Sequence, residues 1–356
     1  MASNSTNITG KAKNLSMDPI YDTNWCDMPA EIKLECVGKM EFKERLSLRC
    51  TAKTERSLVD SQKIEFSKGE FVGDDQELIF LLYRANGHFF SRDPKDLNEA
   101  LEFLKYIMKV GVFENLEIGM GTLLTDNEQF MTDDELFTAK NIKFEYCDFD
   151  NMIAFLRKVK NGVESIKIDL GIEISRRLAE ILAIPLVQNA NYWHIQDYEK
   201  TDSLYKVAQM WIERNTIIGT TFQVSVFGDD SFKKFLKRFT DRIVSKSEKR
   251  VRIRTNNPDR HILLERGLDD TVGIDYLVQF YRLIVISSEM RESEYNDNCK
   301  EWICKIDPDV YEENDSELSF ELSDDLSDSY SYDDNNEDSE SYEYDSDDID
   351  SEPYDY

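Results

Sequence analysis

The sequence predicts an α+β protein, in which a small all-α bundle is followed by a repeat-like β/α domain and a disordered acidic tail. Three observations predict this class. Short helical patterns fill residues 25–61, and strand-like runs then recur along the chain with helical patterns between them. The stretch from Glu312 to Tyr356 holds 20 Asp or Glu residues and no Lys or Arg.

The N-terminal residues predict a disordered segment and then three short helices. Residues 1–20 are polar and rich in Ser, Asn and Lys, which favours disorder. In residues 24–64, Pro29 suits the first turn of a helix, and Thr51 can cap a third helix. The apolar residues that recur at helical spacing are Ile32, Cys36, Val37, Met40, Phe42, Leu46, Leu48, Leu58 and Val59. So small a core usually needs a partner or a neighbouring domain to be stable.

Residues 65–114 predict connecting strands and a helix. Strand-like runs lie at Ile64–Phe66 and Leu78–Tyr83, and the sequence Gly-Asp-Asp at 73–75 between them has turn chemistry. A helical stripe of apolar residues then covers 97–108, behind Asp93 and Pro94.

A regular alternation of strand and helix patterns fills residues 115–290. The strand-like runs are Leu116–Ile118, Ile142–Tyr146, Ser165–Leu170, Tyr192–Ile195, Phe222–Phe227, Arg250–Arg254 and Leu283–Ile286. They follow one another at intervals of about 24 to 32 residues, close to the periods of solenoid repeats. Strands that alternate with helices in this way imply a parallel sheet, and units of near-constant length bury their apolar faces by stacking.

The period leaves the curvature of this domain open, because closed barrels and doubly wound sheets alternate in the same way. The sequence has no leucine-rich signature with its ladder of asparagines. We prefer an arc like that of leucine-rich repeat proteins over an open sheet, because stacking of similar units leads naturally to an arc.

Charge and composition exclude several classes of protein. The net charge is −29, and the tail accounts for −20 of it, so the remaining chain is only modestly acidic. This charge argues against a general nucleic-acid binder, and we expect residues 307–356 to be disordered. No apolar run reaches the roughly 18 residues of a membrane helix, and no apolar signal region opens the chain. We therefore expect a cytoplasmic or nuclear protein with reduced thiols and no membrane association.

The titratable residues make no case for catalysis. His88, His194 and His261 lie at no metal-ligand spacing with one another or with a cysteine, and we interpret His194 as a structural histidine. Cys299 and Cys304 lack the second pair that a zinc site needs. A nucleophile elbow and a phosphate-binding loop are missing from the sequence. It therefore predicts a protein that is not an enzyme, with no catalytic residues, no metal and no cofactor.

Residues 28–59 resemble an F-box. The family pattern opens with Leu-Pro-x-Glu and then Leu or Ile, and residues 28–32 read Met-Pro-Ala-Glu-Ile. Its Leu-x-Leu-Arg element, with the small residue and the lysine that follow, matches Leu46, Leu48, Arg49, Ala52 and Lys53. The closing Leu-Val pair matches Leu58 and Val59. Two positions depart from the pattern: Met28 replaces the opening leucine, and residues 54–56 lack the usual tryptophan, an aromatic anchor for the partner.

The stretch LRCTAKTERSLVDSQKI, residues 48–64, is similar to the large nematode class of F-box proteins, whose remaining chain is an FTH domain. The resemblance is specific over residues 25–66 and looser over residues 115–290, where the β/α alternation agrees with an FTH-like domain. It implies a non-catalytic substrate adaptor of an SCF-type cullin–RING ubiquitin ligase. The F-box would dock on a Skp-family linker, and through it on a cullin, while the β/α domain presents a protein substrate.

Two sets of binding residues follow. Those expected to contact the Skp-family linker are Met28, Pro29, Ile32, Cys36, Val37, Met40, Leu46, Leu48 and Leu58. Strand alternation turns Ile142, Phe144, Ile166, Ile168, Val224 and Val226 inward. It turns outward a second set, where we expect substrate to bind: Lys143, Glu145, Lys167, Asp169, Gln223, Ser225, Arg252 and Arg254. The alternatives are an ordinary wetted sheet face and, for the whole protein, a ligase-independent scaffold whose acidic tail binds basic proteins.

Overall fold

The computed structural model describes residues 24–73, 78–120, 136–169, 174–198, 202–227, 230–267 and 278–306. The chain divides into two units, residues 1–312 and 313–356, and all of the described residues lie in the first. The segments that we expect to be disordered, 1–20 and 307–356, lie outside the described residues, as do Asp74 and Asp75 of the predicted turn.

The N-terminal bundle contains the three predicted helices. After the short turn η1 (Trp25–Asp27) come α1 (Ala30–Lys39), α2 (Phe42–Arg49) and α3 (Lys53–Asp60). Glu41 and Glu44 form a capping box that satisfies the first amides of α2. The prediction that Thr51 caps α3 is wrong, because Ala52 is the capping residue. The Thr51 hydroxyl instead donates to the carbonyl of Leu48, 2.7 Å away at the end of α2.

The rest of the described chain is built around one mixed sheet. Its 12 strands have the order β3-β2-β1-β4-β5-β6-β7-β8-β12-β11-β10-β9. The strands are β1 (Ile64–Gly73), β2 (Leu78–Tyr83), β3 (Phe89–Arg92), β4 (Gly111–Met120), β5 (Thr138–Glu145), β6 (Ser165–Asp169), β7 (Tyr192–Tyr198), β8 (Thr221–Phe227), β9 (Ile243–Lys246), β10 (Arg250–Arg254), β11 (Arg260–Gly267) and β12 (Val278–Ser287). Strands β1 and β4 to β8 run parallel, which confirms the parallel sheet for this part. The two outermost strands, β3 and β9, have four residues each.

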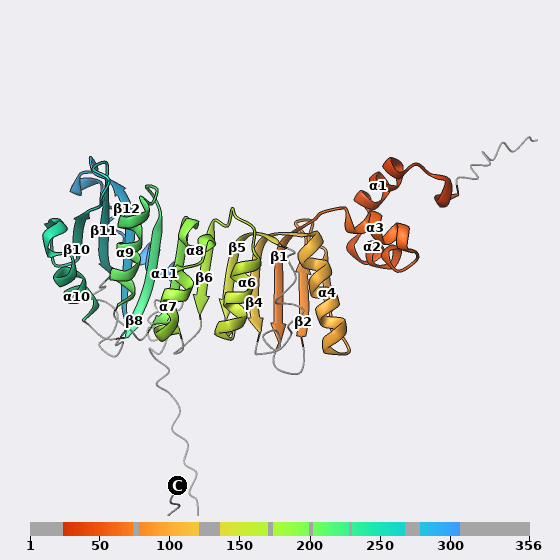
Figure 1. The fold of residues 1–356 in the computed structure, drawn as a ribbon, viewed down its shortest axis with the longest axis horizontal. Coiled ribbons are helices and arrows are strands. Elements are labelled where there is room, and N and C mark those ends of the chain that lie inside the picture. Colours follow the sequence, from red (N-terminus) through yellow and green to blue (C-terminus); the bar gives the residue numbers. More distant parts are fainter. Residues whose placement is uncertain are drawn as a thin grey trace, which may run out of the picture. The chain divides into compact units, whose positions relative to one another are not determined.

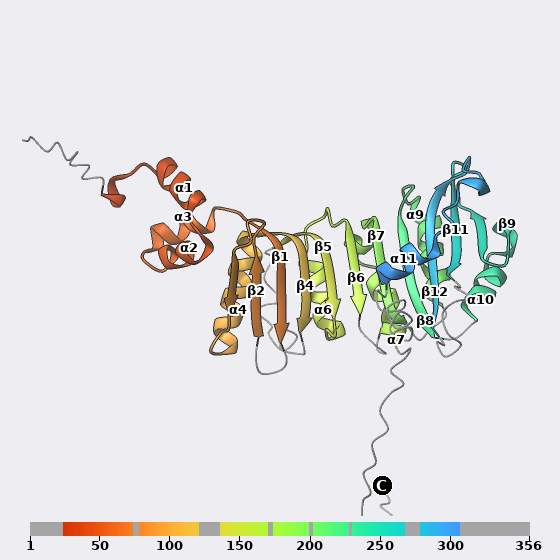
Figure 2. The same cartoon turned by 180° about the vertical axis from the view of Figure 1, so that it is seen from behind.

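Helices cover one face of this sheet. They are α4 (Leu97–Val110), α6 (Phe149–Lys158), α7 (Ile174–Leu182), α8 (Pro185–Asn189), α9 (Ser203–Arg214) and α10 (Ser231–Arg238). These helices lie on the same side of the strands in Figure 1, and α11 (Cys299–Ile306) lies on the opposite side in Figure 2. The core fills the space between the helices and the sheet. The strand residues predicted to point inward are all buried there: Ile142, Phe144, Ile166, Ile168, Val224 and Val226.

A ladder of polar side chains crosses the parallel strands. The alternation of buried and accessible residues slips by one position at the same level of β1, β4 and β5, at residues 67–68, 114–115 and 140–141. At this slip, the side-chain amide of Asn115 donates to a carbonyl of β1 at 3.0 Å, and that of Asn141 donates to a carbonyl of β4 at 3.1 Å. The hydroxyl of Ser165 donates to the side chain of Asn141 at 2.7 Å. Two asparagines and a serine therefore link strands β1, β4, β5 and β6 at one level of the sheet.

The C-terminal end of the sheet departs from the repeat. Arg250–Arg254 and Leu283–Ile286 were predicted as further repeat strands, but β10 and β12 are antiparallel to both of their neighbours. Strand β11, which the pattern missed, lies between them, and β12 pairs with β8. Only a few residues separate β9 from β10 and β10 from β11, so the chain turns back where a repeat would add a helix. The predicted parallel arrangement is wrong for this end, and the arc stays a prediction.

Candidate functional site

One aromatic side chain fastens the N-terminal bundle to the sheet domain. Phe42, the first residue of α2, is buried. Its ring centroid lies 4.8 Å from that of Phe90 on β3 and 5.5 Å from that of Phe66 on β1. Phe103 and Tyr106 of α4 complete the cluster. The neighbouring domain that so small a bundle is expected to need is therefore supplied by its own chain, a role for Phe42 that sequence reasoning missed.

Polar contacts support this junction. The Arg49 guanidinium forms two hydrogen bonds with the Asp60 carboxylate, at 2.7 and 3.3 Å, and lies 4.3 Å from the ring centroid of Tyr106. Burial raises the pKa of Tyr106 to about 12, so this phenol stays neutral. Glu41 accepts a hydrogen bond from Arg84 at 3.3 Å. These contacts join α2 and α3 to α4 and to the residues that follow β2.

The bundle also carries an apolar ridge that the sheet domain does not cover. Ile32 of α1 is 47% exposed, Pro29 is exposed, and Met28 and Cys36 are half-buried. Residues 29, 32 and 36 share one face of the helix, because three- and four-residue steps bring side chains together. We call these four residues the α1 ridge. An exposed apolar cluster of this kind is typical of a surface that binds another protein.

The other residues predicted to meet the Skp-family linker are buried or pack against the core. Val37 is fully buried inside the bundle, which removes it from the predicted docking surface. Four more are half-buried and pack against the core: Met40, Leu46, Leu48 and Leu58. The α1 ridge is thus the part of the predicted surface that lies open to a partner.

On the sheet domain, we call the face opposite α4 to α10 the open face, and its middle strands β5 and β6 present charged side chains there. Lys143 of β5 and Lys167 of β6 are aligned side by side there, and so are Glu145 and Asp169. All four side chains are half-buried, and Lys143 forms an ion pair with Glu145. Since like charges on adjacent strands repel, the row of carboxylates beside the row of lysines balances the charge. Arg254, also predicted for substrate binding, is exposed.

Two predicted substrate residues lie on the open face but are covered. Gln223 and Ser225 of β8 are buried, whereas we expected them to face outward. Helix α11 contacts β8 and β11 on this side (Figure 2). Its Trp302 and Ile303 are buried against Gly267, where an added Cβ would lie 2.7 Å from the Trp302 ring. Strand alternation gave the correct face for Gln223 and Ser225, and the helix packed on that face hides them.

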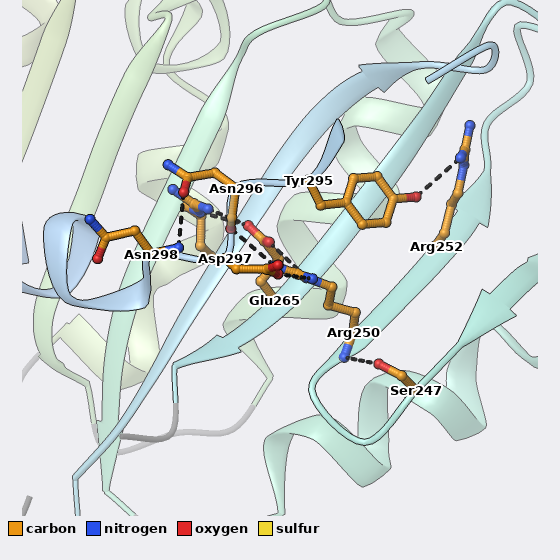
Figure 3. A network of polar contacts seen from close by, with 9 residues as sticks. Ser247, Arg250, Arg252, Glu265, Tyr295, Asn296, Asp297 and Asn298 are labelled. Carbon is orange, nitrogen blue, oxygen red and sulfur yellow. Dashed lines mark hydrogen bonds and ion pairs between the residues drawn. The ribbon is translucent and has the colours of Figure 1, made fainter. Parts of the chain in front are cut away.

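Arg252 is a positioning residue inside the protein. It is 7% exposed, and its guanidinium donates to the backbone carbonyls of Ser287 (3.1 Å), Ser288 (2.7 Å) and Met290 (2.6 Å). A further bond of 3.1 Å goes to the Tyr295 hydroxyl (Figure 3). Because these donors hold the segment after β12, the prediction that Arg252 contacts a substrate does not fit the structure.

A neighbouring ion-pair network holds the segment that leads into α11 (Figure 3). The buried carboxylate of Glu265 accepts from Arg250 at 3.0 Å and from Arg282 at 2.7 Å. Arg250 also pairs with Asp297 at 2.7 Å, and the Arg282 guanidinium lies 5.0 Å from the ring centroid of Trp302. Arg250 and Arg282 therefore serve the architecture of this end, since both are paired with one buried carboxylate.

His194 lies buried on the open face between the lysines and α11. Its Nδ1 atom lies 3.4 Å from the Tyr192 hydroxyl. Burial, together with the charges of Lys167 and Lys143, lowers the pKa of His194 to about 3. The imidazole is therefore neutral at physiological pH, which fits the interpretation as a structural histidine.

The comparison with protein families identifies the N-terminal bundle. The family model of the F-box domain matches residues 25–67, which comprise η1, α1, α2, α3 and the start of β1. The predicted F-box is therefore confirmed. No curated protein and no solved structure matches the chain. An F-box fits an adaptor of SCF ligases, a class of proteins that are generally non-catalytic.

Among the residues that the structure describes, no helix has the length and apolar character needed to cross a membrane. Within the same residues, no group of three or more His, Cys, Asp and Glu side chains is arranged to hold a metal ion.

Proposed function

We propose that this chain is the substrate-recognition adaptor of an SCF-type cullin–RING ubiquitin ligase. Its F-box docks on a Skp-family linker, which binds a cullin, and its β/α domain holds a protein substrate for ubiquitination. The β/α domain is of the FTH type found in nematode F-box proteins, with its parallel strands stacked as an arc. The adaptor is itself non-catalytic and works in the cytoplasm or the nucleus.

The α1 ridge, within the segment that matches the F-box family, carries this proposal. Each large aliphatic side chain of the ridge stabilises a complex by about 1.5–3 kcal/mol when a partner buries it fully. The loss of translational and rotational freedom on association opposes this gain by several kcal/mol. Because Phe42 already joins the bundle to the sheet domain, the exposed Ile32 has no part in that junction and is left for a partner.

The open face supports the substrate-binding half of the proposal. Lys143, Glu145, Lys167 and Asp169 form a block of accessible charges on two aligned strands, and Arg254 adds a cation at the far end of the sheet. Charged side chains held by a rigid sheet favour selective recognition, because mismatched charges on a wrong partner are repelled.

Co-expression with a Skp-family linker tests the docking half. The full chain is expected to co-purify with the linker, and Ile32→Asp to abolish co-purification by placing a charge in the apolar contact. Val244→Asp on β9 is the matched control, because Val244 is also 47% exposed and receives the same carboxylate. Linker binding that survives Ile32→Asp, or is lost equally in Val244→Asp, would refute the proposed docking surface.

A chain shortened before Glu312 separates this proposal from the scaffold alternative. The adaptor keeps linker binding without the acidic tail and loses it without residues 25–61. A scaffold that uses the tail to bind basic proteins shows the reverse dependence, and that result would overturn the adaptor.

A further inference from the structure

A groove on the open face, where β12 ends, has no role in the proposed function so far. Its volume is about 870 Å³. Its lining joins the turn before β8, the last residues of β12 and the segment that follows β12: Ile218, Gly219, Ile284, Val285, Ile286, Ser287, Glu289, Met290, Arg291 and Glu294. Ile284 and Ile286 lie on the same face of β12 as Arg282, so they form the floor of the groove.

One wall of the groove is a turn that exposes two adjacent isoleucines. Ile217 is 55% exposed and Ile218 is 53% exposed. Left-handed backbone at Asn215 (φ 54°) and Gly219 (φ 92°) shapes this turn. The Arg260 guanidinium braces it by donating to the carbonyls of Asn215 at 2.6 Å and Thr216 at 2.7 Å. An exposed apolar pair on a braced turn favours binding, because little conformational freedom is lost when a partner covers it.

The opposite wall is braced in the same way. Arg252 holds the carbonyls of Ser287, Ser288 and Met290, so the segment that carries Met290 and Glu289 cannot drift away from the floor. A buried arginine thus fixes this wall, as Arg260 fixes the other. The positions of the apolar side chains are set before any partner arrives, which is the condition for a pre-formed site.

The charges at the rim indicate what the groove accepts. Among the lining residues, this rim has two glutamates, Glu289 and Glu294, against the single arginine Arg291. The floor and walls offer the accessible side chains of Ile218, Ile284 and Met290, which attract aliphatic side chains. An apolar floor under an acidic rim complements a segment that has aliphatic side chains next to lysine or arginine.

We infer that this groove binds an extended segment of the protein substrate, in which large aliphatic residues are flanked by lysine or arginine. The inference rests on the proposed adaptor function, because it names the substrate class. The aliphatic side chains enter between Ile218 and Met290, and the basic residues meet the carboxylates of Glu289 and Glu294.

Short labelled peptides test this assignment with the full-length protein. Each peptide carries two leucines separated by one residue, flanked by lysines in one set, by serines in a second and by glutamates in a third. Fluorescence anisotropy is expected to show affinity about tenfold higher for the lysine set than for the glutamate set, which is 1.4 kcal/mol. Ile218→Asp weakens the lysine set about tenfold, and Glu289→Lys reverses the preference. Val244→Asp, an exposed apolar residue outside the groove, leaves binding unchanged.

Other outcomes overturn the inference. Equal affinity for the three sets, or equal losses in Ile218→Asp and Val244→Asp, would show that the groove does not select this chemistry. Self-association that sedimentation detects and Ile218→Asp abolishes would make a second copy of this chain the occupant. Two variants distinguish failure of the groove assignment from failure of the adaptor function. Ile218→Asp is expected to bind the Skp-family linker as the unchanged protein does, and Ile32→Asp is expected to bind the peptides as the unchanged protein does. Peptide binding by a chain that never binds a Skp-family linker would refute the assignment of the peptide as a ligase substrate.

Discussion

The F-box helices and the sheet domain bury their apolar residues in opposite ways. Within the three helices, only Val37, Phe42 and Val59 are buried apolar residues, and one of these three points into the neighbouring domain. The sheet domain has its own extended core, in which Trp193 and Trp211 are fully buried. Domains with little interior depend on their neighbours. Folding and docking therefore involve different residues of the bundle: Phe42 packs into the sheet domain, whereas the proposed docking surface is the α1 ridge.

The largest expected effect comes from removing the link between the two regions. Phe42→Ala is expected to lower the free energy of unfolding by about 3–5 kcal/mol, because it leaves a cavity among four aromatic rings. Chemical denaturation followed by tryptophan fluorescence measures the loss. Phe89→Ala is the matched control, since that phenylalanine is exposed and is expected to cost far less. Equal losses in the two variants would mean that the bundle does not depend on the aromatic cluster.

Two glycines, one in each region, lie in opposite environments. Gly267→Ala is expected to destabilise the sheet domain by about 2–3 kcal/mol, because the new methyl group meets the buried Trp302 ring. Gly38→Ala in α1 is expected to stabilise the bundle by about 1 kcal/mol, because its Cβ enters open space and alanine favours helix. Thermal unfolding of both variants measures the two shifts. If the melting temperature shifted in the same direction in both variants, the packing around Gly267 and the open space around Gly38 would not explain the stability changes.

We expect His194 to contribute to the acid response of the sheet domain. The unfolded chain protonates this histidine near pH 6.5, whereas the folded protein keeps it neutral down to about pH 3. The unfolded state therefore gains protons as the pH falls below 6.5, and the free energy of unfolding decreases, by about 2 kcal/mol between pH 7 and pH 5. His194→Gln removes this part of the pH dependence. Urea unfolding across this pH range checks it, and identical slopes for both proteins would exclude His194 as the cause.

The smallest effect on stability is expected where the effect on binding is largest. Ile32→Asp changes an exposed position of α1, so the free energy of unfolding is expected to shift by no more than about 0.5 kcal/mol. If Ile32→Asp no longer binds the Skp-family linker but unfolds at the same free energy, docking and folding depend on different residues. A large destabilisation would instead show that Ile32 contributes to the core of the bundle, so that folding and docking would not use different residues.

The sequence predicted the parallel part of the fold because local pattern and tertiary structure agree there. The strands from β4 to β8 have buried apolar residues at alternate positions, such as Ile166 and Ile168 of β6, and the helices between the later ones carry stripes that match the buried face. The prediction for the C-terminal end was wrong because the spacing of strands does not show whether they run parallel or antiparallel. Val251 and Ile253 alternate with arginines as in a repeat strand, yet β10 is joined to its neighbours by tight turns.

The candidate sites were predictable to the extent that local periodicity decides them. Alternation gave the faces of Lys143 and Gln223 correctly, but only the path of α11 decides that Gln223 is covered. Helical spacing gave the ridge around Ile32 and included Val37, which turns into the bundle. Arg252 looked like a surface charge because sequence does not show which carbonyls surround a guanidinium. The groove escaped prediction because its walls come from segments about 70 residues apart in the chain.

The two edge strands of the sheet, with four residues each, affect how readily the protein aggregates. Long unpaired borders act as templates on which foreign chains add strands and form aggregates. Strands β3 and β9 give such chains little to extend, and they end in the charged residues Arg92 and Lys246. The short borders therefore limit the addition of foreign strands to this sheet.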